Sequence, residues 1–177
     1  MKMILAALLA AFLLAGCVSQ TNGGSDLKAE KGDAVAVDYL GTLDDGTVFD
    51  TSIQSEAQKA GLPLRPSYEP LEFTVGAGQM IAGFDDAVLG MKEGDEKTVK
   101  LPPSQAYGEK RKDLIIDVPA SQFGNTTVQV GTKLQATNGM VATVVNVSND
   151  TVTIDANHEL AGQTLTFKII MRKITRS

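Results

Sequence analysis

Apolar and polar residues alternate at every second position in several segments of this chain. In Asp33–Leu40 the alternation places Val35, Val37 and Tyr39 on one face. It returns over a longer run, Gln163–Ile174, with Leu165, Phe167, Ile169 and Met171. A period of two is typical of a β-strand with one buried face. The chain must therefore fold into at least one sheet that covers a core.

Further strands are predicted between these two segments. Leu71–Val75 and Glu96–Leu101 are short extended runs, and Asn138-Gly139 joins Thr132–Thr137 to Met140–Val147 as a hairpin. One segment alone has helical spacing, with Ile81, Phe84, Val88 and Met91. Because strands outnumber helices, the sequence predicts an antiparallel, β-rich α+β fold.

The N-terminus has the pattern of an export signal. Lys2 precedes the apolar run Ile4–Leu14, which is too short for a bilayer span of about 20 residues. Leu14-Ala15-Gly16-Cys17 then resembles the lipobox of prokaryotic lipoproteins, in which the Cys is acylated. We expect a signal peptide over 1–16, lipidation of Cys17, a flexible tether over 17–29, and an extracytoplasmic, membrane-anchored protein. The alternative is a plain secretory signal in which the Cys has no role.

Composition excludes several classes of function. The chain has 16 Lys and Arg against 21 Asp and Glu, a net charge of −5, which argues against a nucleic-acid partner. One Cys and one His exclude a disulfide framework and a zinc finger. The single His158 lies in a turn, and we interpret it as fixing that turn by hydrogen bonds. We expect no metal and no cofactor.

A catalytic centre in this chain must therefore work with little acid–base chemistry. Rotation about an X–Pro peptide bond is one such reaction, with a barrier of about 18–20 kcal/mol. Twisting the planar amide reduces its dipole, so a site that excludes water favours the twisted form. Tyr hydroxyls and a fixed carboxylate can stabilise that geometry.

Five motifs occur in one order along the first part of the chain. They are Val37-Asp38-Tyr39-Leu40-Gly41, Gly46-Thr47-Val48-Phe49-Asp50-Thr51-Ser52, Phe73-Thr74-Val75-Gly76, Gln79-Met80-Ile81-Ala82-Gly83-Phe84 and Ala106-Tyr107-Gly108. Together they resemble the FKBP-type peptidyl-prolyl cis-trans isomerases. The resemblance implies an antiparallel sheet wrapped around one short helix.

A later run, from Asn157 to Phe167, is similar to the SlyD-type branch of that family. There the chain re-enters the catalytic domain after a small β-rich insert-in-flap domain, which is associated with chaperone binding. The resemblance implies a catalytic domain over 30–108 and 157–177, and a client-binding insert over 109–156. We expect no counterpart of the branch's metal-binding tail, since the residues up to Ser177 that follow this run contain no His or Cys.

The resemblance also assigns the site. Tyr39, Asp50 and Tyr107 take the catalytic positions. The substrate-binding positions are Phe49, Leu71, Met80, Ile81, Phe84 and Phe167. Two positions depart from the common pattern, because Phe84 stands where Trp is frequent and Leu71 where an aromatic residue is frequent. The alternative for each residue is core packing, to which we assign Phe73, Val75 and Val99.

The apolar residues expected to bind clients in the insert are Ile115, Ile116, Val118, Phe123, Leu134 and Met140. The alternative is that they form the insert's own small core. The expected partners are unfolded or proline-containing polypeptides, and the expected state is a monomer. The rival function is a non-catalytic holdase lipoprotein, and a third possibility is a surface adhesin or solute-binding lipoprotein.

Overall fold

The computed structural model describes residues 27–124, 127–135 and 139–176. Cys17 and the expected signal peptide lie outside this range. In chain order the strands and α-helices are β1 (Ala34–Leu43), β2 (Val48–Thr51), α1 (Gln54–Lys59), β3 (Leu71–Thr74), α2 (Ala82–Val88), β4 (Glu96–Leu101), β5 (Ile115–Pro119), β6 (Lys133–Gln135), β7 (Val141–Val147), β8 (Thr151–Asp155) and β9 (Leu165–Thr175). Three short 3-10 helices, Pro103–Gln105, Lys112–Leu114 and Ala120–Phe123, complete the list.

The first sheet is five-stranded and antiparallel, with the order β2-β1-β9-β4 and with β3 also paired to β1. The two predicted alternating segments are its long central strands. They pair from Ala34 opposite Thr175 to Leu43 opposite Leu165, with one register shift after Ala36. Segments at the two ends of the described chain therefore form the middle of one sheet.

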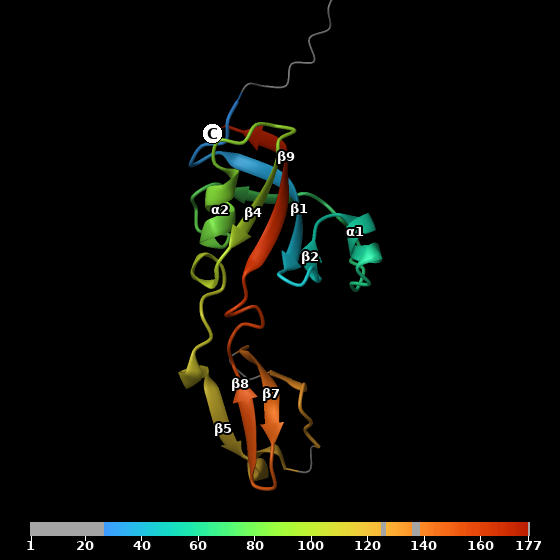
Figure 1. Cartoon of the computed structure of the whole chain (residues 1–177), viewed down its shortest axis with the longest axis vertical. Coiled ribbons are helices and arrows are strands. Elements are labelled where there is room, and N and C mark those ends of the chain that lie inside the picture. The colour runs from blue at the N-terminus through green and yellow to red at the C-terminus, as the bar shows by residue number, and fades with distance from the viewer. Residues whose placement is uncertain (1–26, 125–126, 136–138, 177) are drawn as a thin grey trace, which may run out of the picture.

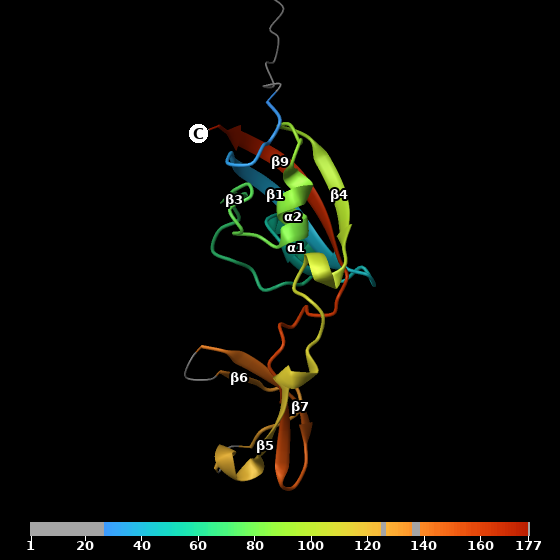
Figure 2. The same ribbon diagram turned by 90° about the vertical axis from the view of Figure 1, so that its left-hand side faces the viewer.

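Helix α2 packs across one face of this sheet (Figure 2). The inward residues of β9, which are Leu165, Phe167, Ile169 and Met171, are all at most 5% exposed. The helix approaches closely at Gly83, where an added Cβ would lie 2.5 Å from the Leu101 Cδ2 atom of β4. A sheet wrapped around one short helix is the α+β fold that the sequence predicts.

A second, four-stranded sheet with the order β5-β8-β7-β6 lies at the far end of the long axis (Figure 1). Its fully buried residues are Val144 and Val152, at 0% and 1% exposure. The strands on either side of the expected Asn138-Gly139 turn, β6 and β7, pair in antiparallel fashion, while Asn138 itself lies outside the described residues.

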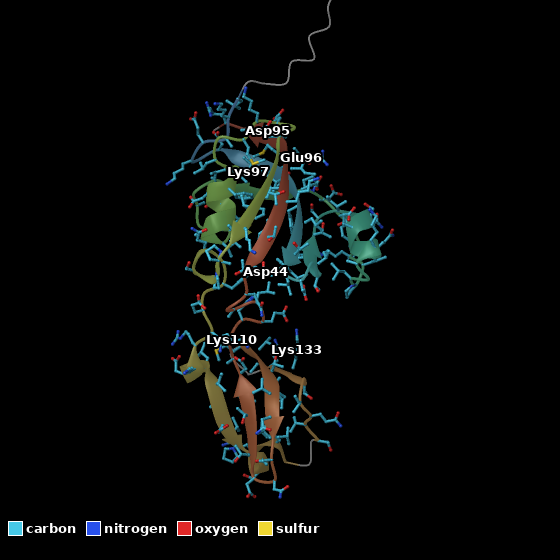
Figure 3. All side chains as sticks on the ribbon, in the orientation of Figure 1. Asp44, Asp95, Glu96, Lys97, Lys110 and Lys133 are labelled. Atoms are coloured by element: carbon cyan, nitrogen blue, oxygen red, sulfur yellow. The ribbon has the colours of Figure 1, made fainter. Side chains whose placement is uncertain are left out.

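Two chain segments connect the sheets, and they bond to each other. The Arg111 N–H donates to Asn157 Oδ1 and the Asn157 side-chain amide donates to the Arg111 carbonyl, both at 2.9 Å. The Gly162 N–H donates to the Gly108 carbonyl at 2.8 Å. Lys110, at this junction in Figure 3, pairs with Asp155 at 3.2 Å.

The folded part extends further toward the N-terminus than the expected boundary at residue 30. Ala29 is 1% exposed and its N–H donates to the Met91 carbonyl at 2.8 Å. Val99, assigned to the core, is only half-buried because β4 is an edge strand. Within the described ranges, no helix has the length and apolar character needed to cross a bilayer.

Candidate active site

The structure brings the nine expected site residues together around one hollow of about 450 Å³. We call it the aromatic hollow, and its lining residues are Tyr39, Phe49, Asp50, Leu71, Gln79, Met80, Ile81, Phe84, Tyr107 and Phe167. The sheet contributes residues from β1, β2, β3 and β9, and α2 contributes Phe84. Met80 and Ile81 come from the turn before α2. Of the lining residues, only Gln79 was missed, although it lies within a recognised motif.

Phe84 lies at the centre of the aromatic cluster. Its ring meets Tyr39 edge-on at 6.0 Å between centroids, and it meets Phe73 at 5.9 Å. Phe49 meets Phe167 at 5.6 Å with an interplanar angle of 90°. Edge-to-face pairs of this kind are favourable beyond the area that they bury. The rings of the lining thus pack against one another, and Phe84, at 3% exposure, belongs to both core and hollow.

Gly41 on β1 makes room for this lining. An added Cβ would lie 2.6 Å from Phe49 Cζ and 3.1 Å from Phe167 Cε1. A side chain at this position would have to displace the Phe49 ring. The sequence shows Gly41 within the first motif but does not reveal this steric role.

A carboxylate lies at one side of the hollow. The Tyr39 hydroxyl donates to Asp50 Oδ2 at 2.7 Å, and the Thr51 N–H donates to Asp50 Oδ1 at 2.9 Å. The Arg65 guanidinium also donates to Asp50 Oδ1. Asp50 is thus held from three directions. Arg65 was missed by sequence reasoning because it comes from the long loop between α1 and β3.

Both Tyr side chains of the hollow stay in the phenol form. Burial raises the pKa of Tyr39 to about 12, and the hydrogen bond to Asp50 adds to the effect. Burial, followed by the charge of Asp50, also raises the pKa of Tyr107. Tyr107 is 40% exposed, so it lies at the mouth of the hollow. Its hydroxyl is available as a hydrogen-bond donor at neutral pH.

A family model described as FKBP-type peptidyl-prolyl cis-trans isomerase matches residues 25–171. The chain belongs to this family of isomerases. It is 44% identical over 149 residues to the short-type peptidyl-prolyl cis-trans isomerase of Methanocaldococcus jannaschii, covering 82% of this chain and 93% of that protein. This agreement confirms the resemblance drawn from the five motifs.

Two further relatives carry the SlyD name. The FKBP-type peptidyl-prolyl cis-trans isomerase SlyD of Vibrio cholerae is 33% identical over 147 residues, covering 81% of this chain and 67% of that protein. The SlyD of Treponema pallidum is 38% identical over 108 residues, or 59% of this chain and 61% of that protein. The FKBP-type isomerase described here thus has SlyD relatives, as the run from Asn157 to Phe167 indicates.

The six residues expected to bind clients divide into two groups in this isomerase. Ile115 and Ile116 are each 42% exposed, and Met140 is 52% exposed. Val118, Phe123 and Leu134 are half-buried instead. The exposed apolar surface also includes residues that sequence reasoning missed, namely Val130, Val141, Val145 and Val147. The core of the second sheet is built from Ala142, Val144 and Val152, so the expected residues are not its most buried members.

Proposed function

We propose that this isomerase acts outside the cytoplasm as a lipid-anchored foldase whose second sheet binds unfolded clients. The aromatic hollow would take the proline ring of a client, and the second sheet would hold the same chain nearby. The observation that carries the proposal is the combination of a hollow lined mostly by aromatic and aliphatic side chains with a separate surface of exposed apolar residues.

The hollow supports catalysis by desolvation and orientation. An amide twisted out of plane has a smaller dipole than the planar form, so an apolar lining penalises the planar form more. The Tyr39–Asp50–Arg65 arrangement fixes charge and hydrogen-bond directions before the substrate arrives, which avoids reorganisation during the reaction. Each 1.36 kcal/mol removed from the barrier gives a tenfold higher rate. This reaction needs no residue that exchanges a proton.

The second sheet supports client binding through its open faces and edge. Ile115 and Ile116 are neighbours on β5, so their side chains point to opposite faces, and both are exposed. β5 is also an edge strand of its sheet. Exposed apolar side chains on an edge strand promote aggregation, so their presence is best explained by a role in binding. A client held there has a raised effective concentration at the hollow.

The arrangement of the chain ends supports anchoring through the N-terminus. The Arg176 guanidinium donates to the Lys28 carbonyl at 3.1 Å, so both ends of the described chain meet. They lie at the end of the molecule opposite the second sheet (Figure 1). A lipid on Cys17 would therefore be attached through the end of the molecule that lies away from the second sheet.

Two assays separate the two activities. A short prolyl peptide reports isomerisation alone, whereas refolding of a proline-limited protein also requires client capture. We expect Ile116→Ser with Val145→Ser to slow catalysed refolding and leave peptide isomerisation unchanged. Leu64→Ser is the matched control, because Leu64 is 55% exposed but lies outside the second sheet. Equal refolding by the variant and the wild type would refute client binding by this surface.

The same assays test the rival functions. A holdase would suppress aggregation of unfolded protein while leaving the peptide's isomerisation rate at its uncatalysed value. An adhesin or solute-binding lipoprotein would affect neither refolding nor isomerisation. For the anchor, Cys17→Ser should move the protein from the detergent phase to the aqueous phase after expression in a lipoprotein-processing bacterium. Unchanged partitioning would contradict lipidation at this residue.

A further inference from the structure

The single imidazole of the chain lies flat against a residue of the aromatic hollow. The rings of Tyr107 and His158 are 3.8 Å apart between centroids, with an interplanar angle of 3°. Tyr107 lines the aromatic hollow. His158 lines a different hollow of about 460 Å³, which includes Lys133, Val141 and Thr143 of the second sheet. The stack therefore connects the isomerase site with the junction between the two sheets.

Tyr107 lies outside the helices and strands of the structure. It follows the 3-10 helix Pro103–Gln105 and precedes Gly108, so it belongs to a turn and not to a strand. At 40% exposure much of its side chain faces solvent. A half-exposed side chain retains rotamer freedom unless a neighbour restricts it. The His158 ring covers one face of the phenol and restricts it.

His158 is itself held in place. The Leu160 N–H donates to His158 Nδ1 at 3.1 Å, and the Ala161 N–H donates to the His158 carbonyl at 2.8 Å. The Gly162 N–H donates to the Gly108 carbonyl, which ties the turn of His158 to the segment of Tyr107. The two stacked rings are thus carried by two chain segments that are bonded to each other.

We propose that His158 is a positioning residue for prolyl isomerisation, which holds the Tyr107 hydroxyl toward the twisting amide. This rests on the proposed role of Tyr107 in the hollow. His158 does not touch the substrate, and its action passes through the stacked ring. Because the apolar lining that binds proline is unchanged, losing the stack lowers kcat and leaves KM nearly constant. Aromatic pairs of this kind correspond to a rate effect of about two- to tenfold.

Three substitutions distinguish the stacking role of the His158 ring from a role of its side chain in fixing the turn. His158→Phe keeps a planar ring for the stack and loses the acceptor for Leu160. His158→Asn loses the ring and keeps a short side-chain acceptor of the kind that caps such turns. Glu159→Gln is the neighbouring control, because the Glu159 carboxylate pairs with Lys133 at 2.7 Å and Glu159 is not one of the two stacked residues. We expect His158→Phe and Glu159→Gln to retain kcat, and His158→Asn to lose about two- to tenfold.

A double-mutant cycle tests the route of action. In a Tyr107→Ala background, His158→Asn should cause no further loss of kcat, since the stacked partner is already gone. An equal loss in both backgrounds would overturn the proposal. So would the reverse order of variants, with His158→Asn active and His158→Phe impaired, because His158 would then serve the turn alone.

A spectroscopic measurement is independent of activity. The chain has one His, so its imidazole C2–H resonance is a single signal in the proton NMR spectrum. We expect an upfield ring-current shift that Tyr107→Ala abolishes, and an unshifted signal in the native protein would overturn the stack. If the native protein shows the shift but Tyr107→Ala keeps full kcat, the proposed role of Tyr107 fails and the positioning claim falls with it. A wild-type protein without isomerase activity would instead refute the proposed function itself.

Discussion

Phe84 meets Phe167 edge-on, with 5.1 Å between the ring centroids and an interplanar angle of 80°. One ring comes from α2 and the other from the central strand β9. Both are at most 5% exposed, yet both line the aromatic hollow. The contact that joins helix to sheet is therefore also a wall of the aromatic hollow, and we expect changes here to affect stability and activity together.

Shortening Phe84 tests this double role. Phe84→Ala should lower the free energy of unfolding by about 3–5 kcal/mol, as deletion of a buried aromatic ring does. Phe84→Leu should lose less stability and still reduce kcat/KM. Phe73→Leu is the matched control, because Phe73 is 5% exposed and touches Phe84 but does not line the hollow. Equal activity losses in the two Leu variants would contradict a direct role for Phe84.

Adding one methyl group at Gly41 should distort the aromatic hollow by displacing the Phe49 ring. The new Cβ of Gly41→Ala would lie 2.6 Å from Phe49 Cζ, so the Phe49 ring must move. Overpacking of this kind costs about 1–3 kcal/mol. We expect a higher KM in the peptide assay and a lower melting temperature. Adding Phe49→Leu should restore the melting temperature, and an unchanged Gly41→Ala protein would show that the ring is free to shift.

Arg65 should matter more for activity than for stability. Its pair with Asp50 is half-exposed on the Arg side, and exposed ion pairs contribute about 0–1 kcal/mol. Arg65→Met frees the carboxylate that accepts from Tyr39, so kcat/KM should fall while the denaturation midpoint stays nearly constant. Arg111→Met is the control, since Arg111 forms an exposed pair with Asp113 near the junction. A similar loss in both variants would point to a general charge effect.

Alkaline titration should isolate Tyr39. Its pKa is raised from 10.0 to about 12 in the folded protein, so the neutral phenol is favoured there. This contribution to stability is complete below pH 10 and is lost as the pH rises toward 12. The chain has 3 Tyr and no Trp, which makes phenolate absorbance easy to follow. Tyr39→Phe should lack the last absorbance step and show a shallower alkaline loss of stability.

The hydrogen bonds of Asn157 should restrict the movement of the two sheets relative to each other. Asn157→Ala removes the pair of bonds to the Arg111 backbone. Peptide isomerisation should remain, while catalysed refolding should slow and small-angle scattering should show a broader distribution of lengths. Asn146→Ala, on an exposed position of β7, is the control. An unchanged scattering profile would mean that the remaining bonds fix the junction.

Local patterns predicted the strands well because burial on one face imposes a period of two. The alternating residues of β1 and β9 are indeed the buried ones, and the motif residues converge on the hollow. Arg65 and the Tyr107–His158 stack were not predictable in this way, since each contact joins a loop residue to a residue of a separate segment. Val99 was predicted to be buried in the core but is only half-buried, because a sequence pattern does not show which strand lies at an edge. In the second sheet, Val144 and Val152 fill the core because they belong to the two central strands, β7 and β8. The sequence pattern does not reveal this strand order.

Strand β9 is the last of the described strands along the chain, yet it lies between β1 and β4 in the first sheet. During synthesis, β1 can pair with β2 and β3, but β4 must wait for β9, which is made last. Until then Phe167 and the pairing of β1 and β4 with β9 are not available, whereas the second sheet is already fully translated. The second sheet should thus be able to form on the ribosome before the aromatic hollow exists.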